Sequence, residues 1–152
     1  MAFLIGAALA LCTGLLAWQS GLSKDRAFYA TTLIVIATYY VLFAALAERP
    51  EELIEESLIA LGFALLAVLG FRRGLWIVAA GLALHGVFDL LHTSSAPRWW
   101  PAFCSAYDLV LAAILLGAER RRAKRERTPS RSGSTAHGNA GPREPAVQLQ
   151  PP

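Results

Sequence analysis

The sequence predicts an all-α integral membrane protein, a bundle of about five transmembrane helices. Hydrophobic residues make up 55% of the chain and charged residues only 16%, whereas charged residues are about 25% of an ordinary soluble domain. The apolar residues are concentrated in residues 1–118, and residues 119–152 are polar, basic and rich in Pro, Gly and Ser. A soluble chain of this size could not bury so much apolar surface in one core.

Five apolar segments approach the length of about 20 residues that a membrane-spanning helix needs. They comprise residues 2–18, 27–47, 53–71, 74–92 and 101–118. The first segment has no positively charged stretch before it, unlike a signal peptide, and Leu11 precedes Cys12 where a lipoprotein signal has a small residue. We therefore expect an uncleaved first helix. The connections are short, so neighbouring helices should be antiparallel.

Lys and Arg are distributed unevenly between the two sides of such a bundle. The opposite side from the tail carries Arg49 and Arg98. Up to residue 127, the side that holds the first and third connections and the tail carries ten, namely Lys24, Arg26, Arg72, Arg73, Arg120, Arg121, Arg122, Lys124, Arg125 and Arg127. The positive-inside rule places this basic side in the cytoplasm and the N-terminus outside. The pI of 9.2 is thereby explained without nucleic-acid binding.

The C-terminal tail is expected to behave differently from the membrane domain. Residues 119–152 have few large apolar side chains and should be disordered. Their basic run, residues 120–127, should lie against anionic lipid headgroups. The sequence thus predicts a transmembrane domain at residues 1–118 and a disordered basic cytoplasmic tail at residues 119–152.

The two cysteines should both be free thiols. In this topology Cys12 lies near mid-membrane and Cys104 lies near the outer surface. At 1.5 Å per residue their depths differ by roughly 10 Å, which is too far for a disulfide.

Ionisable residues within membrane spans are costly and mark functional sites. The fourth segment carries His85, Asp89 and His92, whose spacing places them within about 60° on one helix face. The fifth carries Cys104 and Asp108, again one turn apart. Counted from the turn between the segments, His85 and Asp108 lie at equal depth, as do Asp89 and Cys104. We expect each of these pairs to approach across the hairpin.

The start of the third segment adds acidic residues on the same outer side, and Glu55 and Glu56 should enter the membrane boundary. Tyr39 and Tyr40 of the second segment are expected to be packing residues. The candidate polar site therefore comprises His85, Asp89, His92, Cys104, Asp108, Glu55 and Glu56.

Four stretches of the chain are similar to known sequences: residues 25–29, residues 33–40, His85-Gly-Val-Phe-Asp-Leu-Leu-His92 and Trp99-Trp-Pro-Ala-Phe-Cys-Ser-Ala-Tyr-Asp108. They resemble an uncharacterised family of small multi-pass bacterial membrane proteins. The resemblance covers residues from about 20 to 118. It implies a membrane fold and a bacterial origin, and it implies no activity.

Three functions remain open for a small multi-pass protein of the inner membrane. The polar residues fit a structural or accessory membrane component, in which they join helices by hydrogen bonds. They also fit a divalent metal site, such as zinc, in a membrane hydrolase, with His85, Asp89, His92 and Asp108 as ligands. A third alternative is a proton or cation transport component. Five helices are few for a solitary transporter, so that alternative requires a homo-oligomer or a larger membrane complex.

Overall fold

The computed structural model describes residues 1–92 and 94–127, and it confirms the all-α fold class. The described chain forms five α-helices and one short 3-10 helix, η1 (Leu22–Lys24). The α-helices are α1 (Ala2–Gln19), α2 (Arg26–Leu46), α3 (Pro50–Arg73), α4 (Leu75–Leu91) and α5 (Trp100–Arg127). Each corresponds to one of the five apolar segments that the sequence predicts, although α2 and α4 end at Leu46 and Leu91, one residue before the predicted ends.

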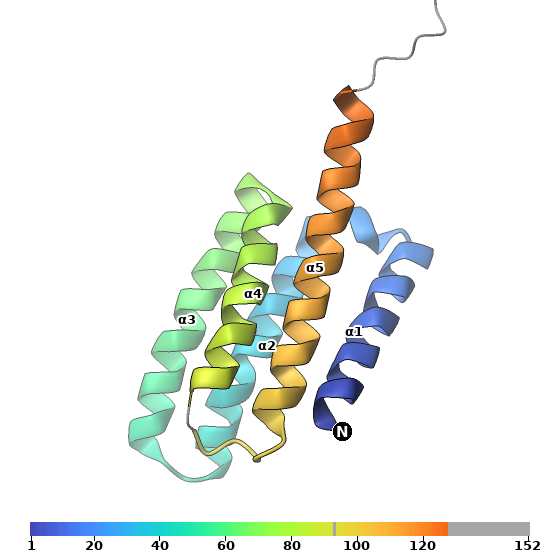
Figure 1. The fold of residues 1–152 in the computed structure, drawn as a ribbon. Coiled ribbons are helices and arrows are strands. Elements are labelled where there is room, and N and C mark those ends of the chain that lie inside the picture. The colour runs from blue at the N-terminus through green and yellow to red at the C-terminus, as the bar shows by residue number, and fades with distance from the viewer. Residues whose placement is uncertain (93, 128–152) are drawn as a thin grey trace, which may run out of the picture.

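The helices form one antiparallel bundle, with α1 beside α5 at one side and α3 at the other (Figure 1). Helices that follow one another in the sequence pack together from α2 onward: α2 on α3, α3 on α4 and α4 on α5. Helix α1 packs on α5. The N-terminus and the α2–α3 and α4–α5 connections lie at one end of the bundle (Figure 1). We call it the acidic end, because it carries Glu48, Glu51, Glu52, Glu55 and Glu56. The opposite end is the basic end, because it carries Lys24, Arg26, Arg72, Arg73 and the end of α5.

Four of the described helices, α1, α2, α3 and α5, are long and apolar enough to cross a membrane. Helix α4 is apolar as well but has 17 residues. At 1.5 Å per residue it is about 26 Å long, slightly less than the roughly 30 Å of a bilayer core. The chain therefore has the helices of a multi-pass membrane protein.

Helix α5 extends further than the sequence predicts. Its expected end was Ala118, but it continues to Arg127, so residues 119–127 are helical where we expected the disordered tail. Two contacts support the extension, because Arg122 pairs with Glu119 and also donates to the Ser23 carbonyl at 2.9 Å. Arg and Ala are good helix formers, which outweighs the lack of apolar residues here. Residues 128–152 lie outside the described residues.

Small residues allow α1 to pack against α5. The buried positions of α1 are Gly6, Ala10, Gly14 and Ala17, a spacing that brings helix backbones together in membranes. A Cβ atom on Gly6 would lie 2.1 Å from the Phe103 carbonyl oxygen, which is closer than any real contact. The close approach of the two helices thus requires glycine at this position.

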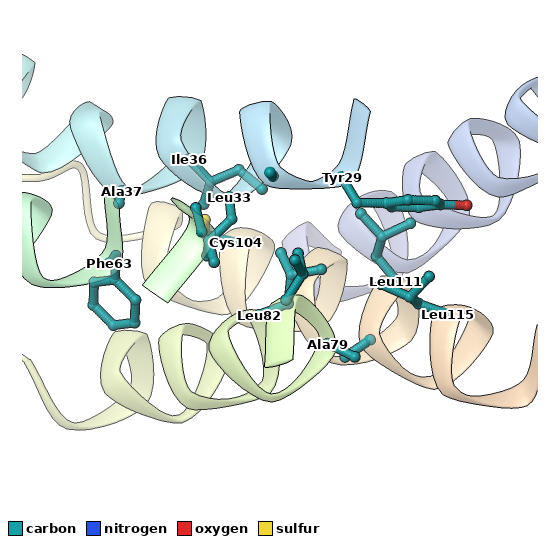
Figure 2. Close-up of a cluster of buried hydrophobic side chains, with 14 of the residues drawn as sticks. Tyr29, Leu33, Ile36, Ala37, Phe63, Ala79, Leu82, Cys104, Leu111 and Leu115 are labelled. Carbon is teal, nitrogen blue, oxygen red and sulfur yellow. The ribbon is translucent and has the colours of Figure 1, made fainter. Parts of the chain in front are cut away.

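The core of the basic half of the bundle is apolar. Tyr29, Leu33, Leu82, Leu111 and Leu115 are each at most 2% exposed, and Figure 2 shows them grouped between α2, α4 and α5. The buried polar or charged residues of the described chain all lie toward the acidic end, and they are Glu56, His85, Asp89, Ser105 and Asp108. The bundle therefore has an apolar half and a half with a polar centre.

We predict that Gly6→Ala destabilises the bundle by about 1–3 kcal/mol, because the added methyl group overpacks the α1–α5 contact. Thermal unfolding of the protein in detergent measures the change. Gly62→Ala on α3 is the matched control, since nothing lies within 4 Å of a Cβ atom there. Equal stability of the two variants would contradict the packing that we describe.

Candidate functional site

Two helical turns on each of α4 and α5 provide the residues of the polar centre. His85 and Asp89 lie one turn apart on α4, and Cys104 and Asp108 lie one turn apart on α5. Gly86 permits the helices to approach closely, because a Cβ atom there would be 3.0 Å from Leu109 Cγ and 3.2 Å from both Asp108 Cβ and a backbone oxygen of α5. The pairs that the sequence predicts therefore face each other across the hairpin.

The four side chains are close together and shielded from solvent. His85 Nδ1 lies 2.7 Å from Asp108 Oδ2 and 3.4 Å from Asp89 Oδ2, and the Cys104 thiol donates to Asp108 Oδ2 at 4.0 Å. One donor atom from each residue lies within 4.8 Å of the other three. All four residues are at most 3% exposed. We call this group, His85, Asp89, Cys104 and Asp108, the buried centre.

Tyr40 joins the buried centre from α2, although the sequence favoured a packing role for it. Its hydroxyl donates to Asp89 Oδ1 at 2.8 Å, and the residue is 2% exposed. Tyr39 does have the expected packing role, since its ring lies 4.9 Å from that of Trp100. Adjacent residues on a helix point about 100° apart, so only the packing of α2 decides which tyrosine faces inward.

His92 belongs to a different contact from the one that the sequence suggested. Its Nε2 atom lies 2.6 Å from Glu56 Oε1 on α3, whereas Cys104 occupies the place beside His85 that His92 was expected to take in the metal set. Glu55 is exposed, and Glu56 is 3% exposed. Nearer the acidic end, Glu52 accepts hydrogen bonds from the backbone N–H and hydroxyl of Ser95, a residue that the sequence did not single out.

Aromatic rings enclose these polar groups. Phe63 of α3 packs edge-on against the His85 ring at 4.7 Å, and Phe88 stacks on the His92 ring at 4.3 Å. Apolar walls lower the local dielectric, which strengthens the interactions between charges and raises the cost of any charge that stays unpaired.

The buried centre holds more carboxylate oxygens than hydrogen-bond donors can satisfy. Among the described residues, Asp89 Oδ2 and Asp108 Oδ1 are buried without a hydrogen-bond partner. Two carboxylates face a single imidazole, and an uncompensated charge inside a membrane bundle is costly. A further proton or a bound cation would compensate this excess of carboxylate oxygens.

The donor set is chemically suited to zinc. Thiolate, imidazole and carboxylate ligands bind Zn²⁺ tetrahedrally at about 2.0–2.3 Å, which corresponds to donor separations of roughly 3.3–3.8 Å. The donors of the buried centre lie within 4.8 Å of one another, so shifts of about 1 Å or less would bring them to zinc geometry. Oxygen-only ligands, which Ca²⁺ and Mg²⁺ prefer, do not match a set with sulfur and nitrogen.

A groove of about 660 Å³ lies beside the buried centre, between α1, α2 and α5. Its walls are mainly apolar, and Cys104 is the residue of the buried centre that lines it.

The cysteines are both free thiols, as predicted, with Cys12 exposed and Cys104 buried.

The chain was compared with protein-family models, curated proteins and solved structures. No family model matches the chain, and neither a curated protein nor a solved structure matches it. The resemblance to a family of small bacterial membrane proteins stays a prediction, and the structure supports its coarser part, a small helical protein with four long apolar helices.

We predict that Tyr40→Phe lowers the free energy of unfolding by about 1 kcal/mol, because hydrogen bonds between membrane helices contribute about 0.6–1.7 kcal/mol. Denaturant titration in detergent measures this loss. Tyr39→Phe is the control, since that residue is 37% exposed and should change stability little. A loss of the same size in both variants would argue against a special role for the Tyr40 hydroxyl.

Proposed function

We propose that this chain is a multi-pass inner-membrane protein with a structural metal centre, in which His85, Asp89, Cys104 and Asp108 bind one zinc ion. The observation that carries the proposal is the convergence of four donor atoms within 4.8 Å of one another. Two buried carboxylate oxygens without a hydrogen-bond partner in the same place support it, because a divalent cation would compensate their charge. This ligand set has Cys104 in place of His92, which the sequence had suggested as a ligand.

The closed character of the centre favours a structural over a catalytic role. Structural zinc sites have four protein ligands, whereas catalytic sites keep one position open for water or substrate. Here four protein donors converge and all are at most 3% exposed. The hydrolase alternative has less support, because the neighbouring groove reaches the centre only at Cys104. A metal held by α4 and α5, with Tyr40 bound to Asp89, would lock three helices together.

The distribution of polar residues also bears on the transport alternative. Every buried polar or charged residue of the described chain lies toward the acidic end, and the core of the basic half is apolar. A pathway across the bilayer needs polar groups in both halves. The structure therefore favours a centre that is reached from one side of the membrane.

The orientation of the bundle follows from its charges. We infer five membrane-crossing helices, with the acidic end and the N-terminus outside and the basic end in the cytoplasm. Arg120, Arg121 and Lys124 continue helix α5 beyond the membrane domain, where they would contact anionic headgroups.

We predict that a C-terminal fusion to green fluorescent protein is fluorescent and that a C-terminal fusion to alkaline phosphatase is inactive, because the basic end stays in the cytoplasm. Fluorescence and phosphatase activity of intact cells measure this. A fusion within the α2–α3 connection is the control and should give the opposite pattern. An active phosphatase at the C-terminus would reverse the proposed orientation.

We predict that the purified protein retains about one zinc ion per chain and that Asp108→Ala and Cys104→Ser each lose it, because a four-ligand site does not tolerate the loss of a ligand. Elemental analysis of protein in detergent measures the metal content.

Cys12→Ser is the matched control for the thiol, since Cys12 is exposed on α1 and should leave the zinc content unchanged. A protein without metal, or full zinc content in Asp108→Ala, would contradict the metal centre. In that case the buried centre would be a hydrogen-bonded helix contact only.

A further inference from the structure

Glu56 and His92 form a second pair of metal-binding side chains that the buried centre does not use. His92 follows helix α4 three residues after Asp89, which places it about 4.5 Å nearer the acidic end. Its Nε2 atom lies 2.6 Å from Glu56 Oε1. Imidazole and carboxylate are both zinc ligands, but two ligands hold an ion less firmly than four.

This pair lies between the surface and the buried centre. Side-chain exposure falls from 26% at Glu52 to 15% at His92 and 3% at Glu56, and then to 1% at His85 and 0% at Asp89. Glu52 lies one turn before Glu56 on α3, so the carboxylates follow one another along one helix face. The polar side chains thus form a descending series from the acidic end to the buried centre.

One oxygen of the Glu56 carboxylate is free to bind a cation. Its Oε2 atom is buried without a hydrogen-bond partner, although Oε1 contacts His92. A buried carboxylate oxygen without a partner is costly, and a cation bound between Oε2 and the imidazole would compensate it. The His92 ring is held in place by Phe88 at 4.3 Å and by Tyr40 at 5.5 Å, so the ligand is already oriented.

We propose that Glu56 and His92 form a loading site, which binds a divalent transition-metal ion from the outer surface and passes it to the buried centre. The inference rests on the proposed metal centre. It adds a second site with its own residues, and it explains how an ion reaches ligands that are almost fully buried. The loading site acts on the route of the ion and not on its final ligands. Its loss therefore slows both uptake and release of the ion and leaves the equilibrium affinity of the buried centre unchanged.

The experiment compares zinc uptake and release in metal-free protein in detergent, with Zn²⁺ alone as the probe. Uptake is followed after mixing, release is followed after addition of a chelator, and the dissociation constant is measured at equilibrium. Glu56→Gln and His92→Asn should slow both rates about tenfold, the low end of the effect of a charged cleft on association. Glu55→Gln is the matched control, because that neighbouring residue is exposed.

Unchanged rates in both variants, with normal binding by the wild-type protein, would overturn the loading site and leave the metal centre intact. Weaker zinc affinity without slower uptake would also overturn it, because the residues would then support the bound ion rather than its route. Absence of zinc binding by the wild-type protein would remove the metal centre and the loading site together. Full zinc content of the variants at equilibrium shows that they are folded.

Discussion

The contact between His85 and Asp108 is the interaction around which the acidic half of the bundle is arranged. It joins α4 to α5 at 2.7 Å and brings Asp89 and Cys104 into the same small volume. Tyr40 connects α2 to this group through Asp89, and Phe63 of α3 covers the imidazole. Four of the five α-helices therefore contribute a side chain to the surroundings of one histidine.

That contact also brings two carboxylates together where their negative charge is poorly compensated. Bringing two carboxylates to one imidazole inside an apolar bundle leaves carboxylate oxygens without partners. The two residues that carry these oxygens, Asp89 and Asp108, are at most 1% exposed. The proposed divalent cation would compensate their charge, and a mixture of sulfur, nitrogen and oxygen donors favours a transition metal over a hard cation.

The two halves of the bundle follow different packing rules. In the basic half, leucine, alanine and tyrosine side chains fill the core (Figure 2), and Gly81 of α4 allows close approach to α2. Gly81 leaves room for Leu33, whose Cδ2 atom would lie 2.6 Å from a Cβ atom there. In the acidic half, polar contacts join α2 and α3 to α4, and α4 to α5. A membrane supplies little hydrophobic force between helices, so close packing and interhelical hydrogen bonds hold them together.

The sequence by itself determined the helices and most of the candidate site, because both depend on local spacing. Apolar length identified five helices, and the i, i+4 spacings of His85, Asp89, Cys104 and Asp108 placed them at matching depths of one hairpin. Only the tertiary structure decided which side chains meet around them. The rotation of α2 brings Tyr40 inward and Tyr39 outward, and the position of α3 takes His92 to Glu56 and leaves the fourth donor place to Cys104. Helix rotation and choice of neighbour depend on the packing of the whole bundle, which no local pattern encodes.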